Sequence, residues 1–146
     1  MLSTDCGFSN REDLVKYGPT LLVDVGFDPT FDPGKEGSIP IPSIQQIHAV
    51  VDTGATISCI DKQLAAQLKL PVVDRENLAG IGGAYVADMH AAQIYIPALD
   101  HIQYGSFAGV DLVSGGQRHF ALIGRTFLGN FQMDYNGITG KVVIRG

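Results

Sequence analysis

The chain has 146 residues, of which 45% are hydrophobic and 17% charged, a composition that excludes a disordered protein and suits one globular domain over residues 1–146. The net charge of −5, with no Lys/Arg cluster, excludes nucleic acid as the main partner, because phosphate binding needs clustered positive charge. No apolar run approaches the roughly 18 residues of a membrane helix and no secretory signal opens the chain, so we expect a soluble, cytoplasmic protein without membrane contact.

The first third of the chain predicts two strands separated by a long loop. Residues 1–17 are polar and predict one helical turn or an N-terminal arm. An apolar run at 20–27 predicts the first strand, and residues 28–43, with four prolines and two glycines, predict a long ordered loop. Residues 47–52, "IHAVVD", are nearly all apolar and therefore predict a second strand that is buried on both faces.

One helix follows. Residues 61–70, "DKQLAAQLKL", have apolar side chains at helical spacing, and they predict a helix that begins after Asp61 as N-cap and ends before Pro71. Residues 79–99 contain "GIGG" and predict a glycine-tipped hairpin whose second arm continues as a strand.

The C-terminal part predicts strands only. Apolar runs at 105–114 and 120–124 predict two of them, and residues 131–144 predict a hairpin turned at Asn136-Gly137. The chain has 18 glycines where about ten would be average, which favours many tight turns between short strands. The sequence therefore predicts a mostly β fold.

The residue that most needs an explanation is Asp52, a carboxylate at the end of an apolar strand. Burying a carboxylate is costly unless it is paired or hydrogen-bonded. Thr53 places a hydroxyl beside it, and Gly54 permits a tight turn. A second apolar strand, "FALIG", also ends at a glycine, Gly124. A functional role accounts for this arrangement better than an aspartate that merely caps a turn.

Three motifs in chain order carry a resemblance to a known family. "VVDTGA", "GIGG" and "LIGRTFL" resemble the catalytic loop, the flap tip and the Ile-Gly-Arg segment of retropepsin-like aspartic proteases. The resemblance covers roughly residues 18–146, and the C-terminal tail is more similar to bacterial and retroelement-type members than to retroviral ones. It implies a single-lobe β-barrel with one short α-helix and a glycine-tipped flap hairpin.

The resemblance also implies roles for individual residues. Asp52 would be the catalytic acid, the Thr53 hydroxyl would bond the opposite catalytic loop, and Gly54 would offer its carbonyl to the substrate backbone. The residues implied to contact substrate are Ala55, the flap tip (Ala79, Gly80, Ile81, Gly82 and Gly83) and Leu122 or Ile123 beneath the loop.

Gly124 and Arg125 are implied to support the site. Retroviral members place an acid four positions after the catalytic aspartate, where it pairs with this arginine. Here that position is Thr56, so the sequence indicates that Arg125 lacks its usual partner.

The predicted function is aspartic endopeptidase activity on extended peptide segments. Water-based peptide hydrolysis needs two carboxylates about 3 Å apart that share one proton. The chain has one Asp-Thr-Gly, so the second Asp52 must come from a second copy in a homodimer. No cofactor or metal is predicted, because the histidines and cysteines lack metal-ligand spacing.

Two alternatives from other classes stay open. The same fold could serve as a non-catalytic peptide-binding or dimerisation module, although the intact Asp-Thr-Gly does not argue for this. A structural β-domain without a ligand would leave the glycine-rich hairpin unexplained.

Overall fold

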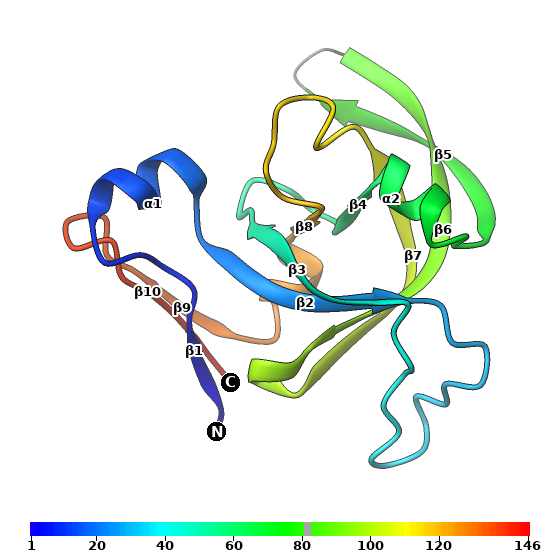
Figure 1. Cartoon of the computed structure of the whole chain (residues 1–146), viewed down its shortest axis with the longest axis horizontal. Coiled ribbons are helices and arrows are strands. Elements are labelled where there is room, and N and C mark those ends of the chain that lie inside the picture. Colours follow the sequence, from blue (N-terminus) through cyan, green and yellow to red (C-terminus); the bar gives the residue numbers. More distant parts are fainter. Residues whose placement is uncertain (81–82) are drawn as a thin grey trace.

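Seven strands form the main sheet of the protein. Figure 1 shows the computed structural model, which describes residues 1–80 and 83–146. The strand order is β2-β3-β8-β4-β7-β6-β5, and an additional pairing of β2 with β6 closes the first six of these into a barrel. In that order the strands span Thr20–Gly26, Ile44–Val51, Ala121–Ile123, Cys59–Asp61, His101–Val110, Gly83–Ile96 and Val72–Gly80.

A second sheet of three strands brings the two ends of the chain together. Its order is β1-β10-β9, with β1 at Ser3–Asp5, β10 at Val142–Arg145 and β9 at Gln132–Tyr135. Figure 1 shows this sheet and helix α1 (Arg11–Tyr17) at one end of the molecule, opposite the long β5–β6 hairpin. Cys6 and Leu14 are buried in the main core, so residues 1–17 are packed against the fold and are not a loose arm.

The main core fills the barrel and continues under the small sheet. Strand β2 contributes Leu21, Val23 and Val25 to it, which alternate along the strand, while Leu22 between them is exposed. The fully buried apolar side chains of the core include Val23, Val25, Ile60, Ile94, Ile96, Ile123, Phe127, Val142 and Ile144.

The prediction of a mostly β fold is confirmed, whereas the prediction of a single helix is wrong. The described residues contain α1, α2 (Lys62–Gln67) and α3 (Arg125–Leu128), plus a 3-10 turn at Pro97–Leu99. Helix α1 has seven residues with Leu14 as its buried one, which agrees with the helical turn that was one of the two predictions for residues 1–17.

Helix α2 confirms the predicted N-cap. The Asp61 side chain accepts a hydrogen bond from the Leu64 N–H at 3.2 Å. The helix ends at Gln67, earlier than predicted, because Lys69 adopts a left-handed backbone with φ of 54°. The Leu70 N–H then bonds the Ala65 carbonyl, which closes the turn before Pro71.

Strand β3 differs from the prediction in its burial. Ile47, Ala49 and Val51 are buried, but His48 between them is exposed. The strand therefore has one core face and one outer face that is exposed or partly exposed.

The C-terminal hairpin is present, but its turn is longer than two residues. Strands β9 and β10 pair with Tyr135 opposite Val142. The Asn136 side chain accepts from the N–H groups of Ile138 and Thr139, and Gly140 takes a positive φ of 88°. Asn136 therefore begins a six-residue connection, from residue 136 to residue 141, rather than a two-residue turn.

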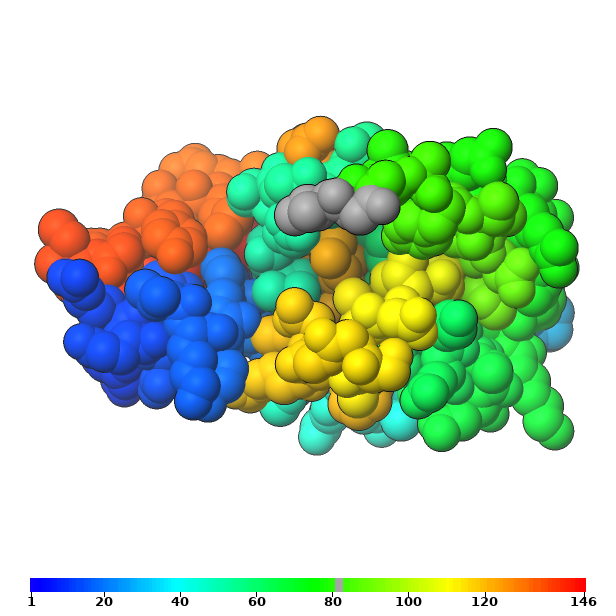
Figure 2. Space-filling view, turned by 90° about the horizontal axis from the view of Figure 1, so that it is seen from above, coloured from blue at the N-terminus to red at the C-terminus, as the bar shows by residue number. Residues whose placement is uncertain are grey.

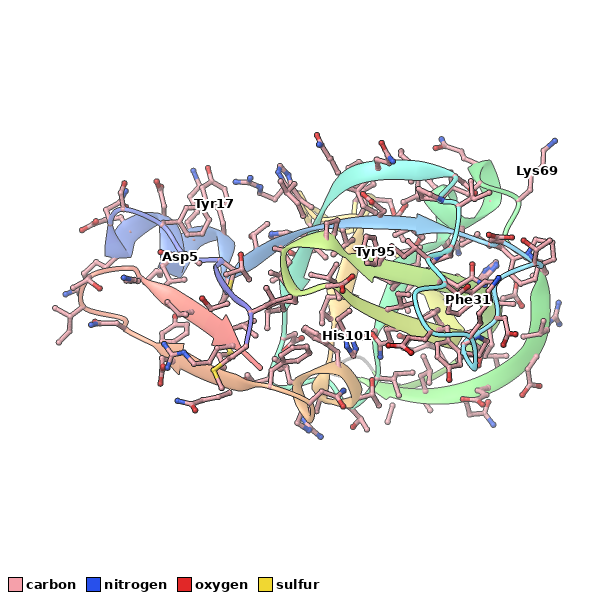
Figure 3. All side chains as sticks on the ribbon, turned by 90° about the horizontal axis from the view of Figure 1, so that it is seen from below. Asp5, Tyr17, Phe31, Lys69, Tyr95 and His101 are labelled. Carbon is pink, nitrogen blue, oxygen red and sulfur yellow. The ribbon has the colours of Figure 1, made fainter. Side chains whose placement is uncertain are left out.

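The proline-rich segment 28–43 is an ordered loop, as predicted. The Asp28 carboxylate accepts hydrogen bonds from the N–H groups of Thr30 and Ile41, which ties the start of the loop to its end. These bonds, with that from the Thr30 hydroxyl first among the causes, hold the pKa of Asp28 below its usual value. Phe31, labelled in Figure 3, belongs to this loop. Its ring packs edge-on against Tyr104 of β7.

Candidate active site

The loop after β3 presents Asp52 at the surface end of a buried strand. Its N–H donates to the Ile123 carbonyl at 2.9 Å, and its Oδ1 accepts from the Gly54 N–H at 2.8 Å. Val51 is buried, Asp52 is half-buried and Thr53 is exposed. The carboxylate therefore keeps access to solvent and holds a local hydrogen bond, which removes most of the cost of placing it there.

Strand β8 and the residues after it hold this loop. Strands β3 and β8 run parallel with Val51 opposite Ile123, so that both strands end at the same edge. Beyond that edge, the Arg125 N–H donates to the Ala55 carbonyl at 2.9 Å. The Gly124 N–H donates to the buried Ser58 hydroxyl at 3.1 Å. The loop is thus fixed by backbone contacts with the Ile-Gly-Arg segment.

Gly124 is required at this junction because there is no room for a side chain. A Cβ at position 124 would lie 2.5 Å from the Ile57 carbonyl oxygen and 2.9 Å from that of Ala55. We expect Gly124→Ala to lower the free energy of unfolding by about 1–3 kcal/mol, measured by urea denaturation. The control is Gly34→Ala, where the nearest atom would be at 3.4 Å and no loss is expected. Equal stability of the two variants would contradict the assigned crowding.

Arg125 has partners that the sequence did not reveal. Its Nη1 donates to the Thr53 carbonyl at 2.8 Å, and its Nη2 donates to the Thr56 hydroxyl at 3.1 Å. Arg125 thus has no acidic partner, as expected, but the Thr56 hydroxyl and the Thr53 carbonyl bind its guanidinium instead. The guanidinium therefore bridges two residues of the loop, Thr53 and Thr56, and stabilises its conformation.

A cleft of about 700 Å³ opens beside Asp52. Figure 2 looks onto the face where the loop after β3 (teal), the β5–β6 hairpin (green) and the segment after β7 (yellow) come together. The described residues that line the cleft are Asp52, Gly54, Ala55, Thr56, Ile57, Cys59, Glu76, Asn77, Leu78, Ala79, Gly80, Tyr85, Val110, Asp111, Leu112 and Leu122.

Most of the residues expected to contact substrate lie at this cleft. Asp52, Gly54, Ala55, Ala79, Gly80 and Leu122 line it, and Gly83 lies on the adjacent hairpin arm without lining it. Ile81 and Gly82 fall outside the described residues.

Ile123 does not contribute to the cleft. Its side chain is fully buried in the main core, because alternate residues of β8 face opposite sides and Leu122 takes the cleft side. Thr53 and Arg125 lie at a separate apolar hollow of about 320 Å³, which Leu128, Gly129 and Met133 complete.

The apolar wall of the cleft consists of Ile57, Cys59, Leu78, Val110 and Leu122, of which sequence reasoning identified only Leu122. These residues pack together around Ala87, Met89 and Ala108 as a second, smaller hydrophobic cluster. The two-residue spacing of Ile57 and Cys59 is the local signal for their shared face. The other members come from strands far apart in the chain, which no local pattern links.

The Cys59 thiol faces the same cleft, but its reactivity is low. Burial, and secondarily the Asp52 carboxylate, raises its pKa to about 11. The thiol is therefore protonated at neutral pH and is a poor nucleophile. Neither Cys59 nor Cys6 is in a disulfide, and Cys6 is buried in the main core.

In the described residues, no three His, Cys, Asp or Glu side chains gather in a way that could hold a metal ion.

One family model matches this chain over more than half of its length. Residues 43–130 match the family described as "gag-polyprotein putative aspartyl protease". Among solved structures, the protease of EIAV complexed with the inhibitor HBY-793 is similar, with 16% identity over 77% of this chain and 86% of that chain and a TM-score of 0.47. No curated protein matches the chain. None of the helices in residues 1–80 and 83–146 has the length and apolar character needed to span a bilayer.

Proposed function

The chain belongs to the gag-polyprotein aspartyl protease family, a retropepsin-like family, and on that premise we propose that it is an aspartic endopeptidase acting on extended peptide segments. The observation that carries the proposal is the position of Asp52. Its carboxylate belongs to the single Asp-Thr-Gly of the chain, is held on a braced loop, and lies at the edge of a cleft with an apolar wall.

Hydrolysis by this site requires two carboxylates in different protonation states. The ionised Asp52 takes a proton from water, whose oxygen attacks the peptide carbonyl carbon. The protonated Asp52 of a second copy donates a hydrogen bond to the carbonyl oxygen, where negative charge develops. Two carboxylates about 3 Å apart share one proton, because both cannot ionise at that distance.

The surface around Thr53 supports a homodimer. Thr53 is exposed, and its hydroxyl makes no hydrogen bond with any described residue, so it is available to a second catalytic loop. The apolar hollow formed by Thr53, Arg125, Leu128, Gly129 and Met133 lies directly beside it. Apolar surface next to the proposed two-fold axis favours association at this face.

Digestion of a peptide library between about pH 4 and about pH 7 tests the function. We expect cleavage next to apolar residues with a bell-shaped pH dependence, because the pair is active only when singly protonated. Unchanged activity in the presence of a metal chelator is part of the expectation. Cleavage that the chelator abolishes, or that increases steadily with pH, would contradict an aspartic mechanism.

A further inference from the structure

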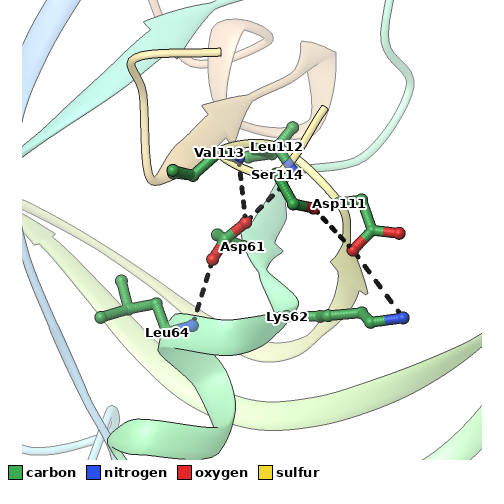
Figure 4. Close-up of polar contacts among 7 residues, drawn as sticks. All are labelled: Asp61, Lys62, Leu64, Asp111, Leu112, Val113 and Ser114. Carbon is green, nitrogen blue, oxygen red and sulfur yellow. Dashed lines mark hydrogen bonds and ion pairs between the residues drawn. The ribbon is translucent and has the colours of Figure 1, made fainter. Parts of the chain in front are cut away.

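Asp61 is a buried carboxylate that lies near the cleft but does not line it. Its side chain belongs to a residue only 2% exposed, and it accepts three backbone hydrogen bonds (Figure 4). Oδ2 accepts from the Leu64 N–H of helix α2 at 3.2 Å. Oδ1 accepts from the N–H groups of Leu112 and Val113, both at 3.1 Å.

Only the first of these bonds is needed to cap helix α2. A serine or asparagine would serve as N-cap equally well, since one side-chain oxygen is enough. The second oxygen instead binds the segment that leaves β7. The backbone N–H of Asp61 also donates to the Phe120 carbonyl at 2.8 Å. Asp61 therefore holds both the beginning and the end of the connection between β7 and β8.

The segment that Asp61 holds forms part of the cleft. Val110, Asp111 and Leu112 all line it, together with the hairpin residues Ala79 and Gly80. The backbone also holds this segment, because Val110 pairs with Asp61 in the β4–β7 ladder and the Gln117 N–H donates to the Leu112 carbonyl at 2.9 Å. The side-chain ion pair on the segment is weak by comparison with the Asp61 contacts. Lys62 and Asp111 lie 3.8 Å apart with both side chains more than half exposed, and solvent screens such a pair.

We propose that Asp61 is a positioning residue, which fixes residues 110–112 as a wall of the cleft and so sets the preference for a large apolar side chain beside the scissile bond. The inference rests on the proposed peptidase function. Residues 110–112 present the side chains of Val110 and Leu112 to the substrate, in the same cleft as Cys59 and Leu122. A loosened wall would occupy the binding-competent position for only part of the time, and apparent affinity falls by that fraction.

Asp61→Ser separates the two functions of the carboxylate. The serine hydroxyl can still accept from the Leu64 N–H, but it cannot also reach the two amides of the loop. We expect KM to rise about tenfold for peptides with leucine beside the scissile bond, with kcat changed less than about twofold. The preference for leucine over alanine at that position should shrink by a similar factor.

Asn10→Ala is the matched control, because it removes the N-cap of α1 at the far end of the molecule. The Asn10 side chain accepts from the Asp13 N–H at 2.8 Å. We expect this variant to lose stability while it keeps KM and the leucine preference. If KM and the leucine preference change as much in Asn10→Ala as in Asp61→Ser, destabilisation alone explains both changes. That result would overturn the positioning role.

Amide hydrogen exchange gives a second readout that does not depend on catalysis. The N–H groups of Leu112 and Val113 should exchange slowly in the parent and much faster in Asp61→Ser. If that variant does not fold, Asp61→Asn replaces it, since its single carbonyl oxygen can serve the helix or the loop but not both.

The outcomes separate this inference from the proposed function. If the parent cleaves no peptide, the proposed function fails, and the role of Asp61 in it fails too. If the parent cleaves and the Asp61 variants keep their KM and their leucine preference, the positioning role alone is overturned.

Discussion

Replacing Asp52 by Asn is expected to reduce peptide cleavage by about 10³-fold or more, because an amide can neither take a proton from water nor share one with a second carboxylate. The substitution keeps the size of the side chain, and the amide oxygen can still accept from the Gly54 N–H. The fold and the binding of peptide should therefore persist. The turnover of a cleavable peptide by Asp52→Asn checks the loss of activity. The affinity of the same peptide for this variant checks that binding persists.

Glu76→Gln is the control for this experiment. Glu76 lines the same cleft from the exposed strand β5 and undergoes the same chemical change from acid to amide. We expect it to keep most of the activity, which would show that cleavage depends on one particular carboxylate. Cleavage unchanged in Asp52→Asn would refute the assignment of Asp52. Peptide binding without cleavage in the parent would instead support the non-catalytic binding module.

An excess of Asp52→Asn chains is expected to suppress the activity of parent chains. In a homodimer with one Asp52 from each copy, a mixed dimer has only one catalytic carboxylate. With a tenfold excess of variant and random exchange, only about one parent chain in eleven pairs with another parent chain. Activity per parent chain should then fall about tenfold. Glu76→Gln chains in the same excess should not suppress it.

Dilution provides an independent test of the proposed dimer. Specific activity should fall on dilution as the chains dissociate. In Thr53→Ala this fall should begin at a higher protein concentration than in the parent. Loss of the proposed Thr53 hydrogen bond across the axis should cost about 1 kcal/mol. Symmetry would remove two such bonds at once, which moves the dimer dissociation constant by roughly one to two decades. Full activity from a species shown by sedimentation to be monomeric would disprove the dimer mechanism.

The sequence by itself determined the features that depend on neighbouring residues. The mostly β character followed from short apolar runs separated by glycines, and the Asp61 N-cap followed from its place before an apolar helical pattern. The Asp52 loop was recognisable for the same reason, since Asp-Thr-Gly after an apolar strand is a local pattern. Turn and cap preferences act within a few residues, so a linear sequence displays them.

Only the tertiary structure decided which distant residues share the site. Arg125 reaches Thr56 because β3 and β8 pair in parallel, a register that no local pattern specifies. The second oxygen of Asp61 reaches Leu112 because β4 lies beside β7. The same pairing places Cys59 and Val110 in one apolar wall. Strand register depends on the combined packing of the whole barrel, and it therefore appears only when the chain is folded.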